Sequence, residues 1–299
     1  MIVLDNVTKT YGATVAVDGV TLAVEAGEIF GLVGPDGAGK TSIIRMLTGV
    51  LATTAGRLAV LGAANPEQVK DRLGYVPQKF SLYGDLTVME NIRTFGALYG
   101  EDAAAIEKRA TAILGFTNLL PFKDRLADNL SGGMKQKLAL AAGLMHRPQI
   151  YFLDEPTTGV DPVSRREFWR MLYRLNREGT TVFVSTPYMD EAELCTRVAF
   201  MHNGRIVACD SPRGLRDAYP HKVLELATAE KNIKQLLAGC RLRDINPFGD
   251  KYHLVADDAA AAAAEVRAAL GAAGAPLAAL AEIPPTLEDV FVALASEVA

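Results

Sequence analysis

One glycine-rich run constrains the fold of this chain more than any other feature: Gly-Pro-Asp-Gly-Ala-Gly-Lys-Thr-Ser at 34–42. It matches the pattern G-x-x-x-x-G-K-[ST] and lies between an apolar segment at 28–33, which predicts a strand, and a segment at 41–47 with helical character. In this context the pattern is typical of a phosphate-binding loop. The alternative is a plain glycine-rich turn without a ligand.

Each residue type in the loop has a chemical reason to be there. Glycines let backbone N–H groups wrap the phosphates, and the helix that follows adds positive potential. Lys40 is expected to reach the β- and γ-phosphates of a nucleotide, and the Thr41 hydroxyl to bind Mg²⁺. The expected nucleotide-binding residues of the loop are Gly34, Pro35, Asp36, Gly37, Ala38, Gly39, Lys40, Thr41 and Ser42.

A second run, Gln-Ile-Tyr-Phe-Leu-Asp-Glu-Pro at 149–156, puts two carboxylates at the end of an apolar strand. The carboxyl ends of parallel strands are where α/β sheets place their sites. We therefore expect Asp154 to bind Mg²⁺, directly or through water, and Glu155 to act as the base that polarises the attacking water. Taken alone, two adjacent acidic residues would normally be read as a solvated turn.

The whole-chain composition excludes several classes of protein. With 299 residues, 49% of them hydrophobic, the chain can form one large domain and a smaller one. A net charge of −4 without long like-charged blocks gives no electrostatic reason to bind nucleic acid or anionic lipid. Three cysteines without a C-x-x-C pair fit reduced thiols in the cytoplasm. Because no apolar run approaches the roughly 18 residues of a membrane span and no signal peptide is evident, membrane contact is expected only through partners.

Local patterns predict the order of elements. Alternation at 15–24 around Asp18-Gly19 predicts two short strands joined by a turn, and Asn203-Gly204 predicts a hairpin. Thr87 is expected to cap a helix. Further helices are predicted at 101–114 and 162–177, and parallel strands at 149–153 and 180–185.

We expect two domains, 1–220 and 221–299, because two prolines and a glycine interrupt the pattern near 211–221. A helical subdomain is expected within the first, at about 80–145. In the second, Asp257-Asp258 is expected to cap a helix of alanines.

A third motif distinguishes this chain from other proteins with a phosphate-binding loop. Leu130-Ser131-Gly132-Gly133-Met134-Lys135-Gln136 precedes an apolar helical run, and by itself it would be read as a helix cap. Together with the two earlier motifs, it resembles the signature of ABC ATPases. The resemblance implies that Ser131 and Gly133 contact the γ-phosphate of ATP held by a facing subunit.

Other positions match the same family across residues 1–220. Tyr11 resembles the aromatic residue that stacks on adenine, Gln78 the glutamine that senses Mg²⁺ and the γ-phosphate, and Asp161 the loop that crosses to the other subunit. Taken alone, Tyr11 would be read as packing and the other two as turn residues. By resemblance, the residues expected to take part in catalysis are Lys40, Gln78, Ser131, Gly133 and Glu155.

The resemblance also gives an architecture and a direction of transport. It implies a P-loop NTPase of the ABC ATPase type, with a parallel-sheet core, an antiparallel β subdomain, a helical subdomain and a small α+β C-terminal module. Pro-Thr-Leu-Glu-Asp-Val-Phe at 285–291 resembles the closing segment of multidrug and daunorubicin-like exporter subunits. The segments 79–83 and 85–91 also resemble these exporter subunits.

Two positions depart from the family pattern. Pro187 stands where a histidine usually contacts the γ-phosphate, and proline has neither an imidazole nor a backbone N–H. Asp36 stands where asparagine is common. These departures lead to the hypothesis that the chain hydrolyses its own ATP slowly while completing a competent site on a different partner, as an asymmetric heterodimer.

The leading hypothesis is an energy-coupling ATPase at the inner face of the cell membrane. Two ATP-binding subunits, identical or different, would close on ATP and drive transmembrane permease subunits. The alternatives are a catalytically weak ATP-binding scaffold and an ABC ATPase without a transporter, although the latter usually carries a coiled-coil insertion or tandem domains. GTPase and kinase readings are weaker because the 130–133 signature belongs to neither and no N-K-x-D motif appears.

Overall fold

The computed structural model describes residues 1–100 and 102–297. Contacts divide the chain into two compact units, Met1–Pro212 and Arg213–Ala299, each with its own buried core. Helix α7 (Pro212–Asp217) begins at this division, whereas the sequence places the boundary after it, at residue 220. We describe the two units separately.

The first unit is built on a six-stranded sheet in the order β5-β6-β7-β3-β8-β9. Neighbouring strands are parallel except for the β8–β9 pair, which forms the hairpin predicted at Asn203-Gly204. Both turn residues have positive φ, 47° and 81°, as a tight hairpin turn requires. The strands are β3 (Ile29–Val33), β5 (Leu73–Val76), β6 (Ile150–Asp154), β7 (Thr181–Thr186), β8 (Arg197–His202) and β9 (Arg205–Asp210).

A smaller antiparallel sheet has the order β2-β1-β4, from β1 (Ile2–Tyr11), β2 (Thr14–Val24) and β4 (Ala55–Val60). The prediction of two strands within 15–24 was wrong, because β2 is continuous through Gly19. Its pairing with β1 shifts register there, from Val7↔Val20 to Lys9↔Val17. The positive φ of Gly19, 59°, accommodates the extra residue as a bulge, so the chain stays paired instead of turning back.

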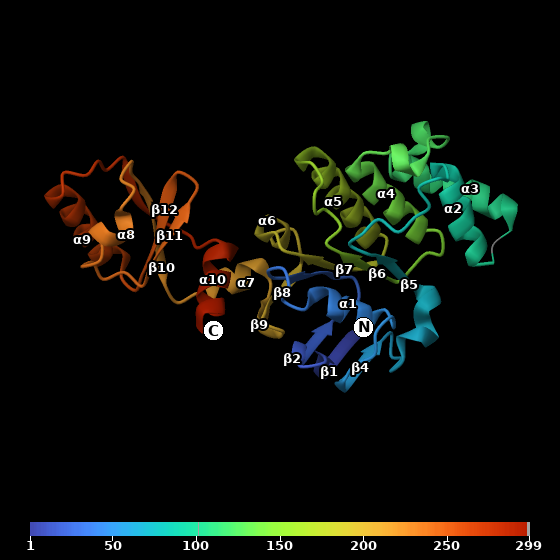
Figure 1. Ribbon diagram of the computed structural model, residues 1–299, viewed down its shortest axis with the longest axis horizontal. Coiled ribbons are helices and arrows are strands. Elements are labelled where there is room, and N and C mark those ends of the chain that lie inside the picture. Colours follow the sequence, from blue (N-terminus) through green and yellow to red (C-terminus); the bar gives the residue numbers. More distant parts are fainter. Residues whose placement is uncertain (101, 298–299) are drawn as a thin grey trace. The chain divides into compact units, whose positions relative to one another are not determined.

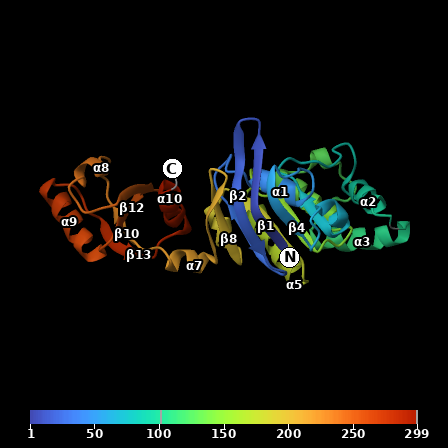
Figure 2. The same cartoon turned by 90° about the horizontal axis from the view of Figure 1, so that it is seen from below.

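Three helices of the first unit form the helical subdomain: α2 (Val88–Leu98), α3 (Ala103–Phe116) and α4 (Gly132–Gly143). Figure 1 shows them grouped beside the six-stranded sheet, and Figure 2 shows the same group from below. Thr87 caps α2 as predicted, in a capping box with Glu90. Glu101, where the next predicted helix begins, lies outside the described residues, and Asp102 caps α3. The remaining helices of this unit are α1 (Lys40–Leu47), α5 (Pro162–Arg177) and α6 (Met189–Ala192).

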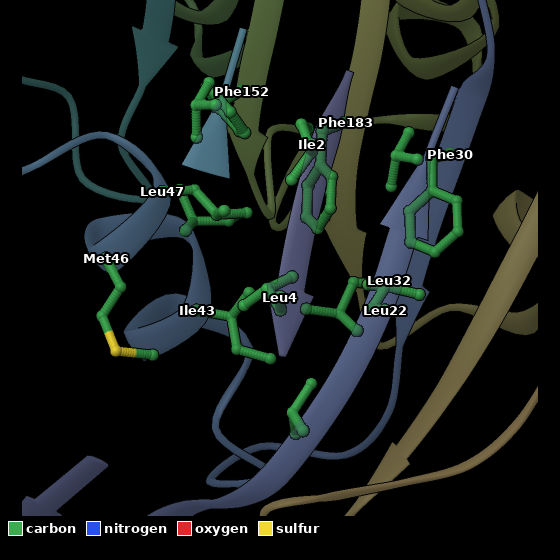
Figure 3. Close-up of a cluster of buried hydrophobic side chains, with 14 of the residues drawn as sticks. Ile2, Leu4, Leu22, Phe30, Leu32, Ile43, Met46, Leu47, Phe152 and Phe183 are labelled. Atoms are coloured by element: carbon green, nitrogen blue, oxygen red, sulfur yellow. The ribbon is translucent and has the colours of Figure 1, made fainter. Parts of the chain in front are cut away.

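The main core of this unit is apolar and joins both sheets to α1. Figure 3 shows Ile43 and Leu47 of α1 next to side chains of the strands, including Leu4 and Phe183, and Met46 of the same helix belongs to this core. Burying these side chains fixes α1 against the strands of both sheets and so holds the loop that joins β3 to α1. The order strand, loop, helix predicted for 28–47 is confirmed.

The second unit contains an antiparallel sheet in the order β11-β12-β10-β13. Its helices include the alanine-rich helix that the sequence predicts. Asp258 caps that helix, as predicted, and Ala262, Val266 and Leu270 bury one face of it against the sheet. The strands are β10 (Lys222–Ala227), β11 (Asp244–Phe248), β12 (Lys251–Ala256) and β13 (Ala279–Ile283), and the helices are α8 (Ile233–Leu236), α9 (Ala259–Ala272) and α10 (Leu287–Glu297).

Candidate nucleotide-binding site

The carboxyl ends of three adjacent strands bring the sequence motifs together. Register pairs Val33 of β3 with Thr186 of β7, and Ser185 of β7 with Asp154 of β6. The glycine-rich loop after β3 therefore lies beside Asp154, the last residue of β6, and Glu155, which follows it. This is the edge of a parallel sheet at which α/β proteins bind ligands.

The loop at 34–39 can be made only with glycine at certain positions. Gly37 and Gly39 have positive φ, 80° and 108°. A Cβ at Gly34 would lie 2.1 Å from the backbone oxygen of Met201, so even alanine would force the backbone apart. Pro35, Asp36 and Gly37 are exposed, whereas Ala38 and Lys40 are buried. The loop therefore presents its backbone outward while the lysine turns inward.

Lys40 is held by three oxygen atoms. Its side chain is 3% exposed, and Nζ donates to the carbonyls of Gly34 at 2.7 Å and Pro35 at 2.9 Å. The third oxygen is Glu155 Oε1, at 3.1 Å. Because a buried charge is stable only when it is paired, the lysine and the glutamate satisfy each other inside the site.

Glu155 is also held from other directions. Gln78, which follows β5, donates from Nε2 to Glu155 Oε2 at 2.8 Å. The glutamate has a positive φ of 47°, an uncommon conformation for a residue with a side chain, and its N–H donates to Ser185 Oγ at 3.1 Å. Strain of this kind persists only where surrounding contacts impose it, and it is concentrated at functional sites.

Asp154 lies in a polar pocket of hydroxyl groups. Its Oδ1 accepts from Ser185 Oγ at 2.8 Å and Thr41 Oγ1 at 3.1 Å. Burial raises the pKa of the Asp154 carboxyl, the two hydroxyl hydrogen bonds act to lower it, and the negative charge of Glu155 raises it further. A cation bound here would relieve the cost of ionising this buried group.

The donors at this point suit a hard divalent cation. The Thr41 hydroxyl and the Asp154 carboxylate are oxygen ligands, which Mg²⁺ prefers. Among the described residues, no group of three His, Cys, Asp or Glu side chains is arranged to hold a metal. Mg²⁺ usually binds one or two protein groups and completes its shell with water and phosphate oxygens, so the residues present fit it.

Tyr11 lies near the start of α1. The residue is 45% exposed, its hydroxyl is 3.3 Å from Ser42 Oγ, and the Lys9 ammonium lies 5.3 Å from the ring centroid. An exposed aromatic face next to the phosphate loop is a suitable platform for a base.

The signature and the Asp161 loop form a second group at two helix starts. Ser131 caps α4 by accepting from the Met134 N–H at 3.4 Å, and Asp161 caps α5 by accepting from Ser164 N at 2.9 Å. The hydrogen bonds that the Asp161 carboxylate accepts from Ser164 lower the pKa of Asp161. A Cβ on Gly133 would lie 2.6 Å from the Ser164 Cβ, so the two helix starts touch. The hydrogen bonds of this group do not reach the phosphate loop.

Three polar residues of the site were not foreseen from the sequence. Ser185 and Thr186 end β7, and Glu191 in α6 is bonded to Thr186. The run Ser-Thr-Pro at the carboxyl end of an apolar strand was the available signal, since it meets the same sheet edge as the predicted carboxylates.

Comparison with known proteins identifies the family. A family model described as "ABC transporter" matches residues 17–158. The probable multidrug ABC transporter ATP-binding protein YbhF of Escherichia coli (strain K12) is 43% identical over 230 residues, which are 74% of this chain and 40% of that protein. The Nod factor export ATP-binding protein I of Rhizobium leguminosarum bv. viciae is 35% identical over 97% of this chain and 93% of its own length.

Solved structures agree with this result. The dimeric post-hydrolysis state of the ATP-binding cassette MJ0796, bound to ADP and Pi, superposes with a TM-score of 0.66 at 26% identity. The match covers 71% of this chain and 98% of that one. The predicted fold class is thereby confirmed. No helix in the described part of the chain has the length and apolar character needed to cross a bilayer. The chain belongs to the ABC transporter ATP-binding family.

Proposed function

We propose that this chain is the ATP-hydrolysing subunit of an ABC exporter, and that it drives membrane-spanning partner subunits by closing on ATP as a dimer. One observation carries the proposal: Lys40, Gln78, Asp154 and Glu155 converge at the same edge of the parallel sheet, next to the phosphate loop. ATP hydrolysis follows from membership of a family of ATPases. The residue roles and the partners are our proposals.

The phosphate loop and the N-terminus of α1 would bind the β- and γ-phosphates through backbone N–H groups. The Lys40 ammonium, now paired with Glu155 at 3.1 Å, would pair with the phosphates instead. Thr41 and Asp154 would hold Mg²⁺, with Gln78 reaching the same ion, and the ion would neutralise phosphate charge during the reaction. Tyr11 would stack on the base.

Phosphate binding at Lys40 would release Glu155 for its chemical role. Freed from the ammonium, the carboxylate can accept a proton from the water that attacks the γ-phosphate. Gln78, already hydrogen-bonded to Glu155 at 2.8 Å, would help to orient that water. The ion pair would thus keep the base occupied until nucleotide takes its place.

A second subunit would complete the site. Ser131 and Gly132 are exposed at the start of α4, where backbone N–H groups can bind an anion from another molecule. The contact between Gly133 and Ser164 ties this helix start to the Asp161 loop, so both would reach the partner as one surface. The dimeric form of the cassette MJ0796 supports this arrangement.

We propose that the helical subdomain and the Gln78 loop contact the membrane subunits, with residues 80–83 at the exposed beginning of that surface. Tyr83 is 52% exposed, yet its backbone is fixed by the fully buried Asn91, which accepts from the Tyr83 N–H at 3.0 Å and donates to its carbonyl at 2.9 Å. An exposed aromatic side chain on a backbone held in this way is a suitable anchor for a partner. We place the protein at the inner face of the membrane through such partners, and we infer export from the relatives named for multidrug and Nod factor export.

One observation favours a second reading, an asymmetric heterodimer in which this chain hydrolyses ATP slowly. Pro187 follows Thr186 at the edge of the phosphate loop and contributes no donor. Intact Lys40 and Glu155 argue for retained chemistry over a pure scaffold role.

The activity is tested by steady-state turnover of Mg-ATP by the purified full chain. Glu155→Gln is expected to lower kcat by about 10²–10⁴, the usual contribution of a general base. Glu178→Gln makes the same chemical change at an exposed residue that ends α5, and it is expected to leave turnover unchanged. Wild-type turnover in the Glu155→Gln variant would contradict the proposed role.

A further inference from the structure

A buried carboxylate without an assigned role lies beside the candidate site. Glu191, in α6, is 1% exposed. Its Oε1 accepts from the Thr157 hydroxyl at 2.5 Å, and its Oε2 accepts from the Thr186 hydroxyl at 2.6 Å. Both threonines are themselves buried, so water cannot replace these hydrogen bonds.

The two threonines belong to the two segments that frame the hydrolytic site. Thr157 stands two residues after Glu155, in the loop that leaves β6. Thr186 ends β7, and its carbonyl accepts from the N–H of Gly34, the first glycine of the phosphate loop, at 3.3 Å. Glu191 therefore bridges the loop that carries the base to the strand that touches the phosphate loop.

The charge of this bridge is balanced from α5. Arg165 Nε lies 3.6 Å from Glu191 Oε1, and Nη1 lies 3.5 Å from Asp190. The guanidinium also covers the ring of Tyr188 at 4.4 Å. A buried carboxylate needs both a counter-charge and hydrogen-bond donors, and Glu191 has both.

We propose that Glu191 is a positioning residue for ATP hydrolysis: it holds the Glu155 loop against the end of β7 without itself touching nucleotide. The inference rests on the proposed function, in which Glu155 is the base. Glu155 has the strained positive φ, and such a residue keeps its conformation only when contacts on both sides impose it. On the N-terminal side of Glu155, the contact is the hydrogen bond from its N–H to Ser185. On the C-terminal side, it is the hydrogen bond between Thr157 and Glu191.

A carboxylate is needed because it accepts from both hydroxyls at once. A glutamine at 191 has one acceptor oxygen and an NH₂ group that only donates. In Glu191→Gln one threonine hydroxyl must reverse its hydrogen bond, and the loop can shift. Misplacement of a reacting group by about 1 Å typically costs about a hundredfold in rate, so we expect kcat to fall roughly ten- to a hundredfold. The affinity for ATP should hardly change, because the phosphate loop makes no bond to Glu191.

The experiment measures kcat, KM and the thermal midpoint of the full chain with Mg-ATP. The variants are Glu191→Gln, Thr157→Val and the two combined, with Thr157→Ser as the conservative variant that keeps the hydroxyl. Glu193→Gln, an exposed change of the same chemistry near the same helix, is the matched control. We expect both single variants to lose kcat, the double variant to lose no more than either, and Thr157→Ser to regain most of the wild-type rate.

Contrary results are distinguishable. If Glu191→Gln and Thr157→Val keep wild-type kcat, or if they lose only thermal stability, Glu191 has a structural role and the inference fails. If Thr157→Ser is as slow as Thr157→Val, the hydroxyl bridge is not the cause and the inference also fails. If wild type is no faster than Glu155→Gln, the proposed function itself fails.

Discussion

Replacing Pro187 by histidine is expected to accelerate ATP hydrolysis by this chain. Residue 187 directly follows Thr186, whose carbonyl is bonded to the Gly34 N–H at 3.3 Å, so it stands beside the phosphate loop. Proline has no N–H, and the N–H of Tyr188 is already bonded to the Thr186 hydroxyl at 3.1 Å. The backbone at 187 and 188 therefore has no donor left for a phosphate.

The size of the effect follows from the missing donor. One preorganised donor to developing charge is typically worth about 2.7–4 kcal/mol of transition-state stabilisation. Ordering the new side chain at the half-buried position 187 costs about 0.5–1.5 kcal/mol. The difference, about 1.2–3.5 kcal/mol, corresponds to roughly a tenfold to a few hundredfold increase in kcat.

The assay is Mg-ATP turnover by the purified full chain, compared with Pro187→His and with Pro187→Ala. The alanine variant removes the proline ring and restores the backbone N–H without adding a side-chain donor, so it separates these two backbone effects from the effect of the imidazole. Pro187→His combined with Glu155→Gln should return to background. The reasoning is refuted if Pro187→His is no faster than wild type, or if Pro187→Ala is equally fast.

Three further predictions concern stability and pH. Because burial raises the pKa of Asp154 in the folded state, this carboxyl stabilises the fold at low pH, and that stability is lost as pH rises from its ordinary pKa through the raised one. Asp154→Asn should therefore unfold at a higher temperature than wild type at neutral pH but not at low pH. The variant should also lose Mg-dependent turnover. A lower thermal midpoint than wild type at neutral pH, measured by calorimetry, would contradict the stability prediction. Gly34→Ala should destabilise the fold by about 1–3 kcal/mol or more in urea unfolding, since its Cβ would lie 2.1 Å from a backbone oxygen; wild-type stability would mean that the loop relaxes freely. In the second unit, His253 and Asp289 are both buried and 2.9 Å apart, so Asp289→Ala should cost about 1–3 kcal/mol, whereas unchanged calorimetric unfolding would show that the pair contributes nothing.

Much of the fold could be predicted because its signals are local. The glycine-rich turn, the Thr87 cap and the Asn203-Gly204 hairpin each depend on residues close in sequence, and the structure has all three. Asp18-Gly19 shows the limit of local reasoning. The same two residue types suit a turn or a bulge, and pairing with β1, which is a tertiary contact, decides for the bulge.

The site divides in the same way. The candidate residues of the phosphate loop and the two carboxylates at the end of β6 were named from sequence motifs alone, and the structure brings them to one edge of the sheet. Their mutual contacts were not predictable, because the pairing of Lys40 with Glu155 depends on β3 and β6 ending at one edge with β7 between them. The burial of Glu191 was harder to predict, because a glutamate in a helix looks like a surface residue until its two threonine partners are known.

The most direct test of the account is the oligomeric state of the Glu155→Gln variant with Mg-ATP, measured by analytical ultracentrifugation. Without hydrolysis, ATP should hold the phosphate loop of one subunit against the Ser131 helix start of another. The account predicts an ATP-dependent dimer, with a second copy or with a co-expressed second ATP-binding subunit. A variant that binds ATP but sediments as a monomer under both conditions would contradict it.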